Sequence, residues 1–177
     1  IGATTFIVQR RGSGINACDG TDEKCPDRRN PPISFAEWNM IERLPGIANV
    51  IGVLGGGGNF AYKNVRIDNV GYDAYSPDWP QVDASDIDPG RNFTRTEYEA
   101  GQPVVLVNDT LRAQLFGDSE PIGKQVMING RQFTVIGIYK PKAGFLKSLE
   151  GKGPDTPRAI IPLQAAVRTL DVWKGNL

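Results

Sequence analysis

The sequence has no histidine among its 177 residues. Histidine is the side chain whose pKa lies nearest neutral pH, and it is the commonest protein ligand for metal ions. Its absence disfavours most hydrolase and metalloenzyme mechanisms. The two cysteines are also too few for a tetrahedral zinc site, which needs four ligands.

Long apolar runs and an excess of one charge are missing as well. No stretch approaches the 18 or more apolar residues of a membrane-spanning helix. Lys and Arg number 20, as do Asp and Glu, so the formal net charge is zero and we expect no nucleic-acid partner. The chain begins at Ile1 rather than at a methionine, and we expect it to be a fragment of a longer protein.

Glycine and proline are plentiful, with 21 and 13 residues. Such a composition favours many turns and short elements over long helices. A chain of this length is sufficient for one domain, or two small lobes wound together, with a real core. We therefore expect a loop-rich α+β fold.

The two cysteines, Cys18 and Cys25, are separated by six residues in a polar, turn-rich segment. The spacing favours a disulfide and hence an oxidising, extracytoplasmic location; two unpaired thiols on an exposed insertion are the alternative. Nearby carboxylates offer oxygen ligands for calcium but lack the spacing of a helix-loop-helix calcium site, so a solvated acidic loop is favoured. These carboxylates are Asp19, Asp22, Glu23 and Asp27.

The first half of the chain predicts one helix and two strands. Ser34 and Glu37 form a capping box at the start of a packed helix over residues 35–44. Strands are expected at 49–54 and 60–70, with the glycines between them as a flexible hairpin tip. Residues 76–102 are rich in proline, glycine and aspartate and predict a loop without regular core elements.

The second half predicts a buried strand over residues 103–107, followed by a short helix capped by Asn108 or Asp109 and stopped by Gly117. Asn129-Gly130 is the strongest local signal for a tight hairpin turn. The remaining expected elements are hairpin strands at 125–128 and 132–138, the second of them central in a sheet, a loop at 143–157, a strand at 158–163 and a helix from 164 to 170.

Three groups of residues invite a chemical interpretation, and each has a plainer one. Four consecutive glycines suit a phosphate loop, but they lack the Gly-Lys-Ser/Thr ending and lead into a strand, which favours a hairpin tip. Paired carboxylates suit glycoside hydrolysis, although a solvated loop is favoured. Aromatics near a Pro-rich turn suit a ligand platform, but they more often pin a loop to the core. The groups are Gly55 to Gly58; Asp83, Asp86, Asp88, Glu97 and Glu99; and Trp79, Tyr72 and Tyr75.

A series of motifs in fixed order resembles the MacB-like periplasmic core domain, the extracytoplasmic part of an ABC transporter permease of the MacB/FtsX-like class. The resemblance covers roughly residues 33–170. The motifs are Val104-Val105-Leu106-Val107-Asn108, Leu115-Phe116-Gly117-Asp118, Pro121-Ile122-Gly123-Lys124, Ile128-Asn129-Gly130 and Phe133-Thr134-Val135-Ile136-Gly137, with outer matches at Leu44-Pro45-Gly46-Ile47, Asp88-Pro89-Gly90-Arg91-Asn92-Phe93 and Ile160-Ile161-Pro162-Leu163.

The resemblance implies a non-catalytic domain without a cofactor or metal of its own, which couples cytoplasmic ATP hydrolysis to movement of a substrate or lipoprotein outside the membrane. The implied location is the periplasmic or extracellular face of the cell membrane. The implied partners are a nucleotide-binding ATPase subunit or domain, a second permease copy or homologue, and a periplasmic adaptor or lipoprotein.

The resemblance also implies two lobes: a membrane-proximal, porter-like α/β lobe from residues 1–80 and 158–177, and an inserted, mainly β lobe from 81–157. Family members usually continue with a further strand-helix-strand unit, and the Cys18–Cys25 insertion is not part of the likeness. A free-standing extracellular ligand- or carbohydrate-binding domain is the alternative. Loops at lobe tips suit partner contacts; the candidate contact residues are Gly55, Gly56, Gly57, Gly58, Asn59, Phe145, Leu146 and Lys147.

Overall fold

The computed structural model describes residues 6–9, 30–31, 33–83, 85–140 and 156–170. It divides the chain into two compact units. One comprises residues 1–48 and 173–177, and the other comprises residues 49–172.

The first unit contains one described helix, α1 (Phe35–Glu42), which begins as the sequence predicts. The Glu37 N–H donates to Ser34 Oγ, and the Glu37 carboxylate accepts from the Ser34 N–H at 2.7 Å, which completes the capping box. The helix ends at Glu42, two residues before the expected end. The predicted apolar face, Phe35, Trp38 and Ile41, is half-buried while the other residues are exposed, so the helix packs on that face less deeply than expected.

The second unit begins with a long antiparallel hairpin made of β1 (Val53–Tyr62) and β2 (Val65–Tyr75). Its turn lies at Lys63, whose φ is +50°, and Asn64. The four glycines therefore lie inside a paired strand, and the prediction of a flexible hairpin tip there is wrong. Because the antiparallel strands continue past the glycines, the turn forms several residues later than expected.

Residues 76–102 form regular structure rather than the predicted loop. They contain α2 (Trp79–Asp83), β3 (Asp86–Gly90) and α3 (Arg95–Ala100). The signal for α3 was present in the sequence, because Thr94 and Glu97 form a second capping box. Proline and glycine inside β3 concealed the strand.

The elements after residue 102 follow the sequence closely. Asn108 is the N-cap of the helix, and Gly117 follows its last residue. Asn129 and Gly130 both have positive φ, as their hairpin turn requires. The observed elements are β4 (Val104–Asn108), α4 (Asp109–Phe116), β5 (Gln125–Ile128), β6 (Arg131–Lys140), β7 (Arg158–Pro162) and α6 (Leu163–Thr169).

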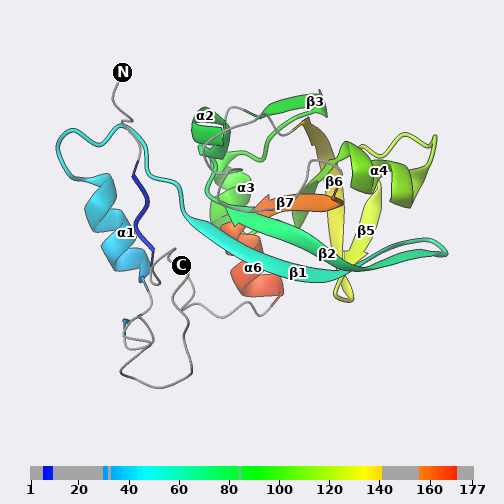
Figure 1. The fold of residues 1–177 in the computed structure, drawn as a ribbon, viewed down its shortest axis with the longest axis horizontal. Coiled ribbons are helices and arrows are strands. Elements are labelled where there is room, and N and C mark those ends of the chain that lie inside the picture. The colour runs from blue at the N-terminus through cyan, green and yellow to red at the C-terminus, as the bar shows by residue number, and fades with distance from the viewer. Residues whose placement is uncertain (1–5, 10–29, 32, 84, 141–155, 171–177) are drawn as a thin grey trace. The chain divides into compact units, whose positions relative to one another are not determined.

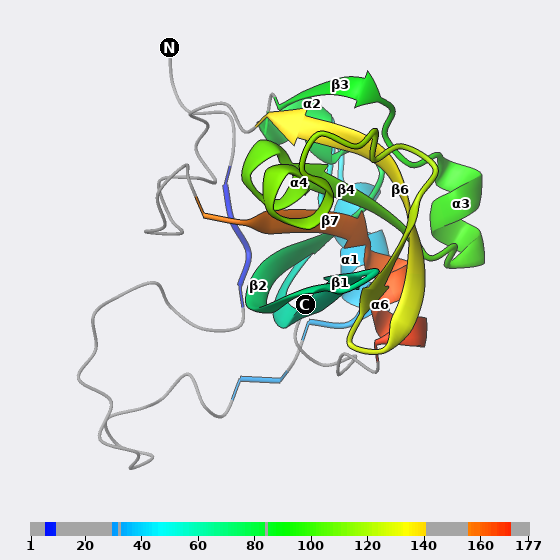
Figure 2. The same cartoon turned by 90° about the vertical axis from the view of Figure 1, so that its right-hand side faces the viewer.

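Six of the strands close into a ring. The sheet order is β3-β6-β4-β7-β2-β1-β5, and β5 pairs with β6 as well as with β1. The ring is therefore β6-β4-β7-β2-β1-β5. Strand β3 lies outside the ring and pairs with residues 137–140 of β6. Strand β6 has neighbours on both edges, which confirms its predicted central position. Figures 1 and 2 show the ring from two sides.

The core fills this ring and the spaces under its helices. Helix α4 contacts β1, β2, β4, β6 and β7, and its inner residues Leu111 and Leu115 are buried. In Figure 2 it lies in front of β4 and β7. Helix α6 packs on β7, β2 and α3. Helices and a mixed sheet in one unit confirm the predicted α+β class.

The predicted division into two lobes stays a prediction. Strands from both expected lobes take part in the same ring: β1, β2 and β7 come from one range, and β4, β5 and β6 from the other. Within the helices that the structure describes, none is long and apolar enough to span a membrane.

Candidate functional site

The glycines proposed as a partner contact occupy the middle of β1, where two of them lie under side chains. A Cβ atom on Gly56 would lie 2.4 Å from Cζ of Tyr72, and one on Gly58 would lie 2.8 Å from Oδ1 of Asn129. Both distances are shorter than a real Cβ contact. A side chain at Gly56 or Gly58 would therefore have to displace Tyr72 or Asn129, whereas a Cβ at Gly55 or Gly57 has room.

Asn129 ties the β5–β6 turn to Asn59 of β1. Its backbone N–H donates to the Asn59 carbonyl at 3.0 Å, and its Oδ1 accepts from the Asn59 N–H at 2.8 Å. The ladder between β1 and β2 shifts register here, because Asn59 alone separates Gly58 from Phe60 whereas two β2 residues separate Ile67 from Val70; the bulge therefore lies on β2, opposite Asn59. These two hydrogen bonds, called the Asn129 clamp, satisfy both backbone groups of Asn59 at the point where β5 meets β1.

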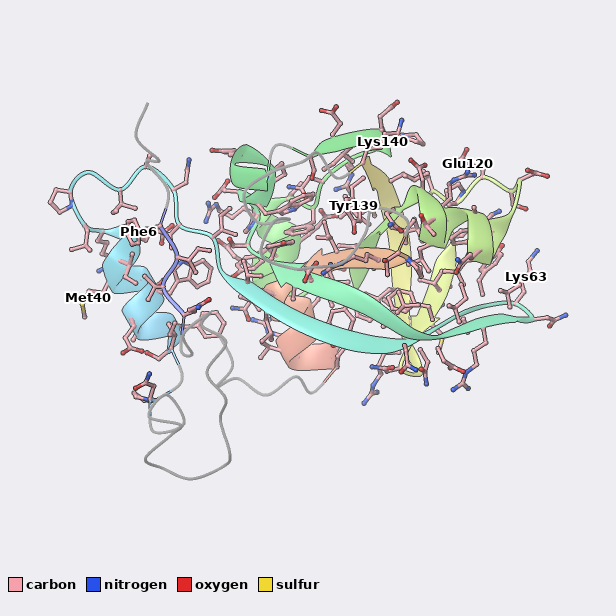
Figure 3. The ribbon with its side chains drawn as sticks, in the orientation of Figure 1. Phe6, Met40, Lys63, Glu120, Tyr139 and Lys140 are labelled. Atoms are coloured by element: carbon pink, nitrogen blue, oxygen red, sulfur yellow. The ribbon has the colours of Figure 1, made fainter. Side chains whose placement is uncertain are left out.

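A cluster of aromatic and cationic side chains lies at the turn of the β1–β2 hairpin. The rings of Tyr62 and Phe116 have centroids 4.7 Å apart. Lys63 Nζ and Lys124 Nζ lie 5.3 and 5.6 Å from the Tyr62 centroid, within cation–π range. Figure 3 places Lys63 at the turn that joins β1 to β2. The cluster packs the hairpin turn against the end of α4 and the segment that leads into β5.

Polar side chains bind the start of β7 to its neighbours. The guanidinium of Arg158 donates to Asp73 Oδ2 at 2.6 Å, and both side chains are largely buried. Asn108 is buried and donates to the Thr156 carbonyl at 2.8 Å; its Oδ1 accepts from the N–H groups of Arg158 and Leu111, both at 3.0 Å. One amide thus holds the N-terminus of α4 and the start of β7 together.

The aromatic residues considered as a ligand platform are buried. Trp79 has no exposed surface; its ring stacks on Tyr75 at 5.5 Å and meets Tyr139 edge-on at 6.2 Å. Its indole N–H donates to Asn92 Oδ1 at 3.0 Å. Tyr72 is also buried. The ligand-platform interpretation is wrong, and these rings pin the segment after β2 to the core.

Of the carboxylates considered as catalytic acids and bases, Glu97 is held ionised. It accepts two hydrogen bonds from the Arg91 guanidinium, both at 2.8 Å, and one from the Thr94 N–H at 2.8 Å. The hydrogen bond from Arg91, with smaller contributions from Thr94, lowers the pKa of Glu97 from 4.5 to about 2. Asp86 and Asp88 lie exposed on β3, and Glu99 lies exposed on α3. Across the part of the chain that the structure describes, no group of three metal-binding side chains occurs.

Several predicted residues lie outside the described residues. These are the expected disulfide partners Cys18 and Cys25, the acidic residues Asp19, Asp22, Glu23 and Asp27, and the candidate contacts Phe145, Leu146 and Lys147. The predictions for them stand untested.

Sequence reasoning missed the side chains that join β1 to distant elements. Lys63 and Lys124 are 61 positions apart (124 minus 63), and no local pattern links them. Asn129 was recognised as a turn residue from its neighbour Gly130, but its clamp on Asn59 spans 70 positions. Only the pairing of β1 with β5 brings these residues together.

Residues 2–176 match the family described as the MacB-like periplasmic core domain. A similar curated protein is the pyoverdine export ATP-binding/permease protein PvdT of Pseudomonas aeruginosa, 31% identical over 147 residues, which are 80% of this chain and 21% of the relative. Another is the macrolide export ATP-binding/permease protein MacB of Chlorobium phaeobacteroides, 32% identical over 139 residues, 76% of this chain and 20% of the relative. The chain thus spans about a fifth of the length of these relatives.

Solved structures share the fold. The periplasmic region of MacB from Actinobacillus actinomycetemcomitans superposes with a TM-score of 0.70 at 17% identity, covering 82% of this chain and 64% of that one. The extracellular domain of the noncanonic ABC-type transporter YknZ, from Gram-positive bacteria, gives a TM-score of 0.67 at 18% identity, covering 80% of this chain and 68% of that one.

A closed α+β ring that matches extracytoplasmic transporter domains defines the class of this protein. It is an extracytoplasmic domain of an ABC transporter permease, on the periplasmic or extracellular face of the membrane. More particularly, the chain belongs to the MacB-like periplasmic core domain family. The findings support this assignment over the free-standing ligand-binding domain and confirm the resemblance seen in the sequence.

Proposed function

We propose that this domain is a non-catalytic coupling element, which transmits movements driven by cytoplasmic ATP hydrolysis to a substrate or lipoprotein outside the membrane. The observation that carries the proposal is the family match over residues 2–176, combined with a ring whose strands are tied across long sequence separations. A ring of this kind moves as one body, which is what transmission of a displacement requires.

The buried contacts support rigid transmission. Strand β7 lies between β2 and β4, and it is fixed there by the Arg158–Asp73 ion pair and by Asn108. The hairpin turn is fixed to α4 through Tyr62 and Phe116. A force applied at either place reaches the other through paired strands rather than through flexible loops.

The proposed partners follow from the transporter context. They are a nucleotide-binding ATPase subunit or domain, a second permease copy or homologue, and a periplasmic adaptor or lipoprotein. The relatives named above are export proteins with ATP-binding and permease functions. We propose export for this protein as well, with ATP hydrolysis carried out by the ATPase part and not by this domain.

Spin-label distances in the full-length transporter test this proposal. Cys18→Ser and Cys25→Ser remove the native thiols, and Glu120→Cys places one label on an exposed position of each permease copy. We expect the distance between the two labels, measured by pulsed EPR in nanodiscs, to differ between the nucleotide-free and vanadate-trapped states. An unchanged distance, in a transporter that still hydrolyses ATP, would contradict the coupling role.

A matched control uses two labels within one copy of the second unit. Lys63→Cys and Asp86→Cys place labels on the β1–β2 turn and on β3, in a heterodimer with one unlabelled copy. We expect this internal distance to stay the same in both states. If it changes as much as the distance between copies, the ring deforms and does not transmit motion as a rigid body.

A further inference from the structure

Asn129 is the one asparagine in the sequence that is followed by glycine. The side-chain amide of an asparagine can react with the peptide nitrogen of the next residue. Glycine at that next position leaves the approach open, because it has no side chain and its backbone rotates freely. Asn129 and Gly130 are both exposed in the structure. Sequence and exposure together single out Asn129 for deamidation.

Deamidation proceeds in two steps and needs only water. The Gly130 nitrogen loses its proton and bonds to Cγ of Asn129, while the bond from Cγ to the side-chain nitrogen breaks and ammonia leaves with that proton. The product is a five-membered succinimide. Water then opens this ring at one of its two carbonyl carbons. Opening at Cγ gives aspartate, and opening at the main-chain carbonyl carbon gives isoaspartate, in which the chain runs through the former side chain.

The folded turn keeps the two reacting atoms apart. Asn129 and Gly130 are the central residues of the hairpin turn between Ile128 and Arg131, and their φ angles are +49° and +77°. Positive φ at both positions is typical of a type I′ turn. In this left-handed conformation the next nitrogen lies nearly opposite Cβ across the Cα–C bond. Cγ therefore reaches the Gly130 nitrogen only after that bond rotates and the turn unwinds.

The Asn129 clamp holds the side chain in the same unreactive state. Oδ1 of Asn129 accepts from the Asn59 N–H at 2.8 Å, so the side-chain carbonyl must leave Asn59 before the ring closes. The opening that this requires is local, because β5 pairs with β1 only through Ile128 with Phe60 and Met127 with Ala61. Such short pairings separate without global unfolding.

We propose that Asn129 is a deamidation site controlled by the Asn129 clamp. The side chain is unreactive while the clamp is closed, and it is converted when the end of β5 separates from β1. Aspartate keeps an oxygen acceptor for the Asn59 N–H, whereas isoaspartate lengthens the turn by one main-chain carbon and displaces the groups that form the clamp. The β1–β5 pairing thus weakens irreversibly in each chain that forms isoaspartate. This inference does not depend on the coupling role proposed above.

Gly58 offers a variant that weakens the clamp and leaves the reacting residues unchanged. A Cβ at Gly58 would lie 2.8 Å from Oδ1 and 2.9 Å from Nδ2 of Asn129, so Gly58→Ala pushes that side chain away from Asn59. Gly57→Ala is the matched control on the same strand. Its Cβ would have its nearest neighbour at 3.8 Å and leaves the clamp in place.

Mass spectrometry of the 177-residue chain measures the conversion. Samples are aged at mildly alkaline pH and digested, and electron-transfer fragmentation distinguishes isoaspartate from aspartate at Asn129. We expect conversion in the folded chain to be about tenfold to a hundredfold slower than in the guanidinium-unfolded chain, because the clamp must open first. Asn69 is exposed and has a φ of +57°, but it precedes Val70 and should stay unmodified. Conversion there as fast as at Asn129 would contradict the role of Gly130.

The two glycine variants test the control by the clamp. Gly58→Ala should raise the conversion rate at Asn129 by about threefold or more while circular dichroism shows a folded chain, and Gly57→Ala should leave the rate unchanged. Hydrogen exchange of the Asn59 amide, followed by NMR, should lose its protection in Gly58→Ala and in the isoaspartate product. It should keep that protection in Asn129→Asp. Equal conversion rates in the unchanged chain and both glycine variants would overturn the proposal.

The unchanged chain keeps the test decisive if Gly58→Ala does not fold. Equal conversion rates in the folded and unfolded chains would show that the clamp gives no protection. Absence of conversion in the folded chain, after ageing long enough for the slower limit of the expected range, would show that the folded protein has no deamidation site at Asn129. Either result would overturn the proposal.

Discussion

Helices α1 and α3 begin with the same device and end in different surroundings. Each starts with a capping box, Ser34 with Glu37 and Thr94 with Glu97. In α3 the inner residue Tyr98 is buried, whereas none of the residues of α1 is. Every buried apolar side chain in the described ranges belongs to residues 54–167, in the unit that contains the ring. Local signals therefore decide where a helix begins, and the ring decides whether it is buried.

The described part of the first unit has an exposed apolar surface. Its α1 segment carries Met40 and Leu44, which are 66% and 50% exposed, and its extended segment carries Phe6 at 63%. Figure 3 labels Phe6 and Met40. In the ring unit, by contrast, side chains as large as Phe60 and Trp79 have no exposed surface. The two units thus differ in how strongly their apolar residues contribute to stability.

The largest expected effect comes from removing an aromatic side chain from the core of the second unit. Phe60→Ala should destabilise the second unit by about 3–5 kcal/mol, because it removes a fully buried side chain and leaves a cavity. Met40→Ala in α1 is the matched control and should change the free energy of unfolding by about 0.5 kcal/mol or less. Guanidinium unfolding followed by tryptophan fluorescence measures both. Equal effects would break the contrast between the units.

A smaller effect on the free energy of unfolding is expected from removing a helix N-cap, and it should differ between Asn108 of α4 and Ser34 of α1. Asn108→Ala should cost about 2–3 kcal/mol, because it removes the cap of α4 and leaves the half-buried Thr156 carbonyl and Arg158 N–H without this partner. Ser34→Ala, at an exposed cap, should cost about 1 kcal/mol of local helix stability only. Circular dichroism reports the helix content, and urea unfolding reports the global stability. A global loss for Ser34→Ala as large as that for Asn108→Ala would show that the units unfold together.

The smallest expected effect is the pH dependence of the two capping-box glutamates. The folded pKa of Glu97 is about 2 against an ordinary 4.5, so its contribution is fully present above pH 4.5 and is lost as the pH falls through about 2. Glu97→Gln should therefore flatten the stability profile of the ring unit between these values. The pKa of Glu37 is lowered by its hydrogen bonds to Ser34, but this group is fully exposed. Glu37→Gln should leave the ring unit's urea midpoint unchanged from pH 2 to 5.

The sequence predicted best those elements whose signals are local. The capping box of α1, the buried run of β4, the Asn108 cap of α4 and the Asn129-Gly130 turn all follow from residues within a few positions of one another. The family resemblance was likewise carried by short motifs in order. Where the deciding residues are neighbours in sequence, propensity and capping are sufficient.

The capping box of α3 was a local signal that was missed, and the other errors occurred where distant residues decide. Glycine has low β-propensity, yet residues 55–58 are held in β1 by pairing with β2 and by the Tyr72 ring over Gly56. The segment at 76–102 reads as a loop, but Trp79 is drawn into the core by Tyr75 and Tyr139, which come from β2 and β6.

The placement of β7 has a consequence for folding during synthesis. Of the strands that the structure describes it is the last to be made, and it lies between β2 and β4 inside the ring. Its partners in β2 precede it by 87 positions, for example Gly71 opposite Arg158. While the ribosome is still adding residues before 158, β2 and β4 have no strand between them, and the ring cannot close. Such non-local closure makes folding slow and leaves the edges of β2 and β4 exposed to chaperones until β7 has been made.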